Sequence, residues 1–402
     1  MNTKWLTNPF FIYSLGFLLV FLVYTLRWSD KYPALSANLI LFLFTTFLIS
    51  FFLAFILEKF KRNEFEKIDP DKNRMFIVFS IYAGYFLEFV YSGGIPIILT
   101  IINPAYSYKD FTGIPTFHVI LGTYGIFYSI YLFHQYICSE EKKKAFILYL
   151  VSVIPNILVI NRGAVVIILI ASLFIYLMEI GKVGIKKVLT IVLSLFLLIY
   201  FFGIIGNIRY KASKEDKAYI LRIGGASEEF IRSNIPPEYY WGYLYIATPI
   251  GNMQNIVNQR NEQFNPGNIP YFVGTELLPD FISKRVVSLF SLDKNRGADR
   301  AEDFYVIRIL NAPTVYFRSY YLLGWFGVWS MYIYSALIML FYSFAISKSS
   351  KYYITGWACL ATIILLNIFS NMWATAGTIL FWPILATLIS KIKFRDLLKR
   401  AK

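Results

Sequence analysis

The sequence has little charge and few of the side chains that most enzymes use for chemistry. Only 16% of its 402 residues are charged, whereas about a quarter is usual in a soluble protein. Two histidines, His118 and His134, and two cysteines, Cys138 and Cys359, lie in separate parts of the chain. With so few residues and such spacing, neither a metal site nor a disulfide framework is expected.

Two common catalytic motifs are also missing. No GxxxxGK[ST] run is present to hold nucleotide phosphates, and no GxSxG run is present to carry a serine nucleophile. An ATP-driven pump and a serine hydrolase of that type are therefore not expected, and we expect the protein to need neither a metal nor another cofactor.

What the chain has is long apolar runs. The sequence is 57% hydrophobic, and Pro9–Leu26, Leu35–Leu57 and Ile185–Ile205 are typical examples of these runs. A helix needs about 20 apolar residues to cross a bilayer. The runs are apolar on every face, unlike the alternating segments of about 10 residues in a membrane barrel. The sequence therefore predicts an all-α integral membrane protein.

Ten membrane-spanning helices are predicted, with one large loop between the seventh and the eighth. The predicted spans are residues 9–27, 34–57, 75–93, 117–138, 144–160, 163–180, 187–206, 322–346, 353–370 and 373–390. The chain thus divides into seven spans in residues 1–206, a large loop in 207–318, and three spans with a basic tail in 319–402.

The net charge of +15 indicates orientation in a membrane, not binding to nucleic acid. Loops on one side of the predicted spans, with the two termini, carry 21 Lys and Arg, whereas the short loops on the other side, with Arg27, carry four. Positive charge gathers on the cytoplasmic side of membrane proteins. Both termini are therefore predicted to be cytoplasmic, with the large loop outside.

The large loop, Asn207–Arg318, is nearly neutral, with 14 basic and 12 acidic residues. Phe281–Phe290 and Asp303–Leu310 have mixed patterns that fit short helices. Tyr239–Val257 is rich in aromatic residues and is expected to lie along the membrane surface or to dip into it. In a shorter external loop, Ile97–Ile102 is too short to span.

Polar residues gather at the external ends of the spans. They are Glu88, the one acid well inside a predicted span, and His118, Asn161, Arg162, Arg209, Arg308 and Arg318. A charge in an apolar setting costs about 2.5–3.5 kcal/mol on insertion scales, so such residues usually face a cavity or a partner. Arginines at this level suit a phosphate ligand, because a guanidinium group binds phosphate oxygens bidentately.

Each of these residues also has a structural interpretation. In that interpretation, Glu88 pairs with an arginine between helices, and His118 bonds backbone at a helix end. Arg162 lies where an arginine can reach lipid phosphate with its long side chain. The sequence leaves both readings open.

Four blocks of the chain resemble the bacterial oligosaccharide repeat-unit polymerases, the Wzy-type O-antigen polymerases. The similarity runs from Glu88 to about Leu340. The blocks are Glu88 with Gly93–Pro96 and Gly113–His118, then Asn161–Gly163, then Tyr243–Asn255, and finally Asn311–Thr314 through Tyr320–Tyr321 to Gly324–Gly327. One departure is that Leu322 and Leu323 stand where several members carry an acid.

The resemblance implies a glycosyltransferase of GT-C-like architecture in the bacterial cytoplasmic membrane, acting on its external face. The donor would be a growing glycan on undecaprenyl pyrophosphate, and the acceptor a single lipid-linked repeat unit. It also implies two protein partners, a chain-length-determining co-polymerase and a flippase.

The residues and the resemblance together give a hypothesis for the site. Arg162, with Arg209 or Arg318, is expected to hold the pyrophosphate, whose growing negative charge preorganised cations stabilise. Glu88 or His118 is the candidate base that takes the proton from the acceptor. The wider set of binding residues includes Arg308, Asn161 and Tyr321.

Three other functions stay open from the sequence. An O-antigen ligase, or another lipid-linked glycosyltransferase, shares the large loop and the arginines. A transporter or flippase is disfavoured because the polar residues gather at one level instead of along the spans. A structural role in envelope assembly is the remaining alternative.

Overall fold

The structure is a computed structural model. It describes residues 3–60, 65–103, 105–107, 110–182, 184–209, 219–260, 264–292 and 300–400. These residues fold as helices joined by turns and loops, with one isolated β-bridge between Ser29 and Ala226. The prediction of an all-helical chain is confirmed.

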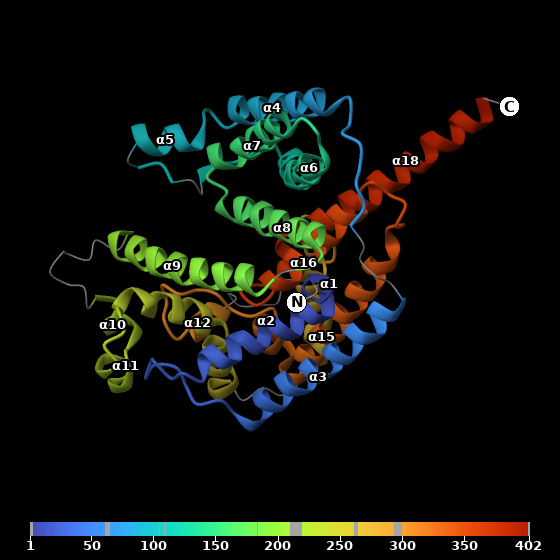
Figure 1. The fold of residues 1–402 in the computed structure, drawn as a ribbon. Helices are drawn as coiled ribbons and strands as arrows, with labels where there is room; N and C mark the ends of the chain where they lie inside the picture. The colour runs from blue at the N-terminus through green and yellow to red at the C-terminus, as the bar shows by residue number, and fades with distance from the viewer. Residues whose placement is uncertain are drawn as a thin grey trace.

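The first half of the chain forms helices α1 to α9 (Figure 1). Their bounds are α1 Thr3–Leu6, α2 Pro9–Tyr24, α3 Ala37–Phe60, α4 Arg74–Tyr91, α5 Pro96–Ile102, α6 Phe117–Cys138, α7 Lys142–Leu158, α8 Arg162–Ile180 and α9 Ile185–Arg209. Helices α4, α6 and α7 group together on one side of the molecule, and α8 lies between this group and the rest.

The second half of the chain contains more short helical elements. It contains α10 Tyr219–Gly224, α11 Glu228–Arg232, α12 Pro237–Gln259, η2 Pro266–Asn268, α13 Ile269–Phe272, η3 Val273–Leu277, α14 Asp280–Leu289, η4 Ala301–Phe304, α15 Phe317–Ala345, α16 Tyr353–Leu366, α17 Met372–Thr375, η5 Gly377–Leu380 and α18 Phe381–Arg400. The element η3 is a single π-helical turn.

Local sequence signals explain several helix ends. The Asn8 side chain accepts hydrogen bonds from the backbone N–H groups of Phe10 and Phe11, and Pro9 takes the first helical position of α2. Asn161 caps α8 in the same way, by accepting from the N–H of Ala164. Gly324 interrupts α15 with a φ of 58°, a backbone conformation that favours glycine.

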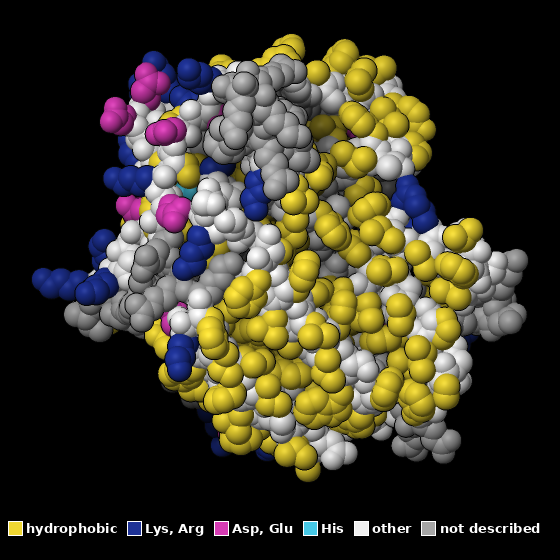
Figure 2. All heavy atoms as spheres, turned by 90° about the vertical axis from the view of Figure 1, so that its right-hand side faces the viewer, with side chains coloured by type: hydrophobic (Ala, Val, Ile, Leu, Met, Phe, Trp, Pro, Cys, Tyr) yellow, Lys and Arg dark blue, Asp and Glu magenta, His cyan; other side chains and the backbone are white. Residues whose placement is uncertain are grey.

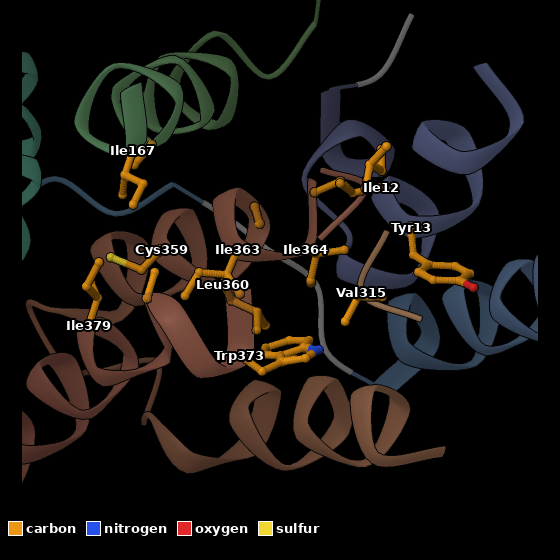
Figure 3. Close-up of a cluster of buried hydrophobic side chains, with 14 of the residues drawn as sticks. Ile12, Tyr13, Ile167, Val315, Cys359, Leu360, Ile363, Ile364, Trp373 and Ile379 are labelled. Atoms are coloured by element: carbon orange, nitrogen blue, oxygen red, sulfur yellow. The ribbon is translucent and has the colours of Figure 1, made fainter. Parts of the chain in front are cut away.

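The core surrounds α16, whose residues are almost all buried. Figure 3 shows Cys359, Leu360 and Ile363 of α16 among apolar side chains from α2, α8 and η5. Trp373 lies against the same cluster and donates its indole N–H to Ser335 Oγ of α15 at 2.8 Å. Residues far apart in the chain thus share one core, which fixes α15 and α17 beside each other.

Four helical stretches are long and apolar enough to cross a membrane, among the residues described. They are Ala37–Phe60, Arg74–Ile102, Arg162–Ile180 and Phe317–Ala345. Many large apolar side chains are exposed, and Figure 2 shows them covering a broad area of one face while Lys, Arg, Asp and Glu gather toward one side. Such a surface suits lipid and not water, and the chain is a multi-pass membrane protein.

Each of the ten predicted spans overlaps a helix, but two predictions on detail need correction. Residues 373–390 are not one helix, because the chain breaks through α17 and η5 before α18 begins at Phe381. Asp303–Leu310 is not helical beyond the short η4. Tyr239–Val257 lies in α12, which is largely buried against α9 and α2, and its predicted place at or in the membrane stays a prediction.

Candidate active site

A polar contact between the end of α4 and the start of α6 joins Glu88 and His118. Glu88 lies in the last turn of α4 and is fully buried, while His118 is the second residue of α6. His118 Nδ1 lies 2.9 Å from Glu88 Oε2. The other carboxylate oxygen, Oε1, is buried and has no hydrogen-bond partner among the described residues.

This geometry leaves one ring nitrogen of His118 for chemistry. A carboxylate beside Nδ1 favours the tautomer with the proton on that nitrogen, so Nε2 is the basic one. The His118 side chain is 37% exposed, whereas that of Glu88 is 0% exposed. The arrangement therefore has a buried acid that orients a histidine within reach of solvent.

The loop between α5 and α6 shapes this pair. A Cβ at Gly113 would overlap the Glu88 carboxylate and would lie 2.7 Å from the Cβ of His118. Phe111 packs edge-on against the His118 ring, with centroids 5.5 Å apart. Gly113 is thus required for the carboxylate and the imidazole to meet.

A second polar cluster lies where the large loop meets α15. Glu276, in the π-helical turn η3, is 2% exposed, and its Oε1 accepts from Arg318 Nε at 2.9 Å. Asn371, just before α17, donates from Nδ2 to the backbone oxygen of Glu276 at 2.8 Å and to its Oε2 at 3.1 Å. The buried carboxylate is therefore paired and hydrogen-bonded, as burial of a charge requires.

Two adjoining cavities connect this cluster with the start of α6. The first, about 300 Å³, is lined by Glu276, Arg318 and Asn371, and the second, about 920 Å³, by Thr116, Arg285 and Thr378. Asp280 and Lys284 of α14 line both. We call the combined space the α14 cleft; each of the two cavities is within the range of about 300–1,000 Å³ that is usual for ligand sites.

Helix α14 forms the link between the cleft and the histidine. Arg285 donates a hydrogen bond from its guanidinium to Thr116 Oγ1, two residues before His118. Thr116 has a φ of 69° and directly precedes α6. Three cations, Lys284, Arg285 and Arg318, therefore line a cleft that reaches Thr116 and Val119 at the start of α6, although neither Glu88 nor His118 is among its lining residues.

The acid Asp280 shares the cleft with these cations. Partial burial raises the pKa of its carboxyl group, although Lys284 and Arg318 nearby favour the charged form. The balance of charge in the cleft favours an anionic ligand, since Glu276 is already paired with Arg318.

The other predicted site residues lie apart from the cleft lining. Arg162 is exposed in the first turn of α8, where Asn161 is the helix cap. Arg308 is exposed in a turn before α15. Tyr321 has the Arg260 guanidinium over its ring at 3.8 Å. Arg209 ends α9, and its side chain lies outside the described residues.

The sequence analysis missed Glu276, Lys284, Arg285 and Asn371. Glu276 carried a usable signal, because it is an acid inside the otherwise uncharged run Tyr271–Pro279. The others gave none, since a lysine, an arginine and an asparagine in external loops are ordinary. No cluster of three potential His, Cys, Asp or Glu metal ligands occurs within the described ranges.

Comparison of the chain with family models, curated proteins and solved structures finds no match. The fold and the candidate site therefore stand on the residues and contacts of this chain.

Proposed function

We propose that this protein polymerises oligosaccharide repeat units that are linked to undecaprenyl pyrophosphate, on the external face of the bacterial cytoplasmic membrane. The observation that carries the proposal is the α14 cleft, which is lined by Lys284, Arg285 and Arg318 and, at the start of α6, by Thr116 and Val119, the residues on either side of His118 in the chain. A cationic cleft next to a histidine–carboxylate pair supports a reaction with an anionic leaving group.

In the proposed reaction, the acceptor hydroxyl attacks the anomeric carbon of the donor glycan. A glycosidic C–O bond forms, the bond between the anomeric carbon and the pyrophosphate oxygen breaks, and lipid pyrophosphate leaves with the electron pair. Nε2 of His118 takes the hydroxyl proton, and Glu88 stabilises the imidazolium that results.

The cations of the cleft hold the leaving group. Arg318 and Arg285 offer planar guanidinium groups to pyrophosphate oxygens, and Lys284 adds a compact charge. Arg318 belongs to the predicted set of pyrophosphate ligands, and Lys284 and Arg285 extend it. Contacts of Arg162 and Arg209 with the same group stay predictions.

The proposal includes a topology of ten spans with both termini in the cytoplasm. The charge difference between the loops, 21 against four Lys and Arg, supports it. The cleft would then face the compartment in which flipped lipid-linked repeat units arrive. A flippase that delivers them and a co-polymerase that sets chain length are the partners of this proposal.

The direct test is a purified assay with a synthetic lipid-linked repeat unit. We expect ladders of polymer from the wild type and a fall in rate of about 10²–10⁴-fold for His118→Gln, the usual contribution of a general base. Glu88→Gln should retain more activity than His118→Gln, because it loses orientation and charge but keeps the base. Glu228→Gln, at a largely exposed acid of the large loop, is the control.

A deletion strain separates this function from that of a ligase. Surface lipid with a single repeat unit indicates a missing polymerase. Long chains left on the undecaprenyl carrier indicate a missing ligase, and that outcome, or full activity of His118→Gln, would overturn the proposal.

A further inference from the structure

A third cavity lies on the other side of the molecule, at the turn between α2 and α3. It has a volume of about 350 Å³ and is lined by residues of this turn, including Arg27 and Asp30, and by Tyr243 of α12. We call it the α2–α3 chamber. It shares no lining residue with the α14 cleft.

An apolar groove continues from this chamber between the two helices. The groove is lined only by Leu, Ile and Phe side chains: Phe17, Leu18, Phe21, Ile40, Leu43, Phe44 and Phe47. Phe21 and Ile40 line both the groove and the chamber, so the two spaces adjoin. A polar chamber at the end of an apolar groove fits an amphiphile, with its head in one and its chain in the other.

Most hydroxyl groups of the chamber are already bonded within the protein. Tyr24 donates to the backbone oxygen of Pro33 at 2.6 Å, Tyr32 bonds Thr248 at 2.6 Å, and Ser29 donates to the backbone oxygen of Gly224 at 2.5 Å. These bonds make the chamber walls rigid. The groups that remain for a ligand are therefore few.

Two charged groups of the chamber are available. The exposed Arg27 and Asp30 side chains form no ion pair or side-chain hydrogen bond within the described part of the chain. Tyr243 also lines the chamber, but its hydroxyl interacts with the backbone of Trp28 and Ser29.

The charged side chains of the chamber indicate which kind of head group it binds. One guanidinium and one carboxylate give no net charge, so they complement a head group with one negative and one positive charge. We propose that the α2–α3 chamber and groove bind a zwitterionic phospholipid with a primary amine in its head group, such as phosphatidylethanolamine. Arg27 holds the phosphate, Asp30 accepts from the ammonium group, and one acyl chain lies along the phenylalanines of the groove.

The site does not depend on the proposed function, because it uses none of the residues of the α14 cleft. A bound phospholipid would fix the α2–α3 turn against α12, to which Tyr243 belongs. The polyprenyl carrier is the less favoured occupant, because its phosphate brings no amine from which Asp30 could accept a charge-assisted hydrogen bond.

The test is native mass spectrometry of the delipidated full-length protein, titrated separately with phosphatidylethanolamine, phosphatidylglycerol and undecaprenyl phosphate. We expect one retained phosphatidylethanolamine and affinity about tenfold lower for the other two, the effect of losing one charge-assisted hydrogen bond. Equal retention of phosphatidylglycerol, or preference for undecaprenyl phosphate, would overturn the proposal.

Matched variants locate the binding. Arg27→Gln should lower retention about tenfold, whereas Lys31→Gln, in the same turn but outside the lining, should not. Asp30→Asn should abolish the preference for phosphatidylethanolamine over phosphatidylglycerol.

Phe44→Ala should weaken retention and Phe52→Ala should leave it unchanged, although the two side chains are similarly exposed on α3, at 59% and 64%. Equal effects within either matched pair would contradict the assigned site.

Discussion

Gly113 leaves the space in which Glu88 and His118 meet. Any side chain there would overlap the carboxylate, and the hydrogen bond of 2.9 Å between the two residues would not survive in its present form. The function of the pair therefore depends on a third residue that takes no part in the chemistry.

We expect Gly113→Ala to lower polymerisation about 10²-fold, because a histidine that is displaced by about 1 Å loses its catalytic alignment. Gly184→Ala is the matched control, since a Cβ at Gly184 would meet nothing within 4 Å. The purified assay gives the rate, and melting in detergent shows whether both variants fold. Full activity in Gly113→Ala would show that the Glu88–His118 contact is not needed.

Asp280 gives a prediction about pH. Its pKa is raised by partial burial, so the unfolded chain releases this proton at a lower pH than the folded protein does. The charged carboxylate therefore costs the folded state free energy above the ordinary carboxyl pKa, about 3.9. Below that pH the group is neutral in both states and costs nothing.

Asp280→Asn should accordingly melt at a higher temperature than the wild type at neutral pH and lose this advantage near pH ~3. The gain should stay below about 1 kcal/mol, because part of the side chain reaches solvent, which screens its charge. Melting curves in detergent across this range test the sign. A constant difference between the two proteins at all pH values would contradict it.

At the scale of elements, the π-helical turn η3 presents Glu276 to two other segments. Arg318 of α15 pairs with one carboxylate oxygen, and Asn371 before α17 bonds the other. Loss of one partner leaves a buried charge without compensation, which is more costly than loss of the whole pair.

Arg318→Met should therefore destabilise the protein by about 3 kcal/mol, whereas Glu276→Gln with Arg318→Met should recover most of that loss. Arg308→Met, at an exposed arginine in the same loop, should have little effect. Thermal or denaturant unfolding in detergent measures these differences. If the single and double variants were equally stable, Glu276 would not be a buried charge.

The sequence predicted the helices better than it predicted how they end. The apolar runs gave α3, α4, α6, α8 and α15 within a few residues, because a membrane-spanning helix follows from hydropathy alone. The break between α17 and α18 was missed, since Trp373, Ala374 and Ile379 are apolar and their burial against α16 and α15 is a tertiary effect.

The candidate site was likewise predicted only in part. Glu88 and His118 were identified from an acid and a histidine at the ends of apolar runs, and the structure brings them together. Arg285 was not, because its bond to Thr116 spans 169 residues and no local pattern reports such a contact. Single residues in unusual places were predictable, whereas the long-range contacts that build the cleft were not.

At the scale of the whole molecule, the proposed function requires that the α14 cleft face the external side of the membrane. The proposed topology places Ser288 of α14 outside and Ser349, between α15 and α16, in the cytoplasm. Ser288 lines the α14 cleft, and Ser349 is exposed.

In a background with Cys138→Ser and Cys359→Ser, a membrane-impermeant maleimide should label Ser288→Cys in intact spheroplasts. It should label Ser349→Cys only after the cells are lysed, because the charge difference between the loops sets this orientation. Gel-shift of the two variants before and after lysis is the measurement. Labelling of both from outside would exclude the topology.

The contacts of Glu276 also set an order for biosynthesis. Arg318 follows Glu276 by 42 residues and Asn371 follows it by 95. While the ribosome is still translating those residues, the turn that carries Glu276 has already left the ribosome without either partner. The turn that carries Glu276 therefore gains its second partner only after α16 has been synthesised, and a chain that stops before Asn371 leaves this acid half-satisfied.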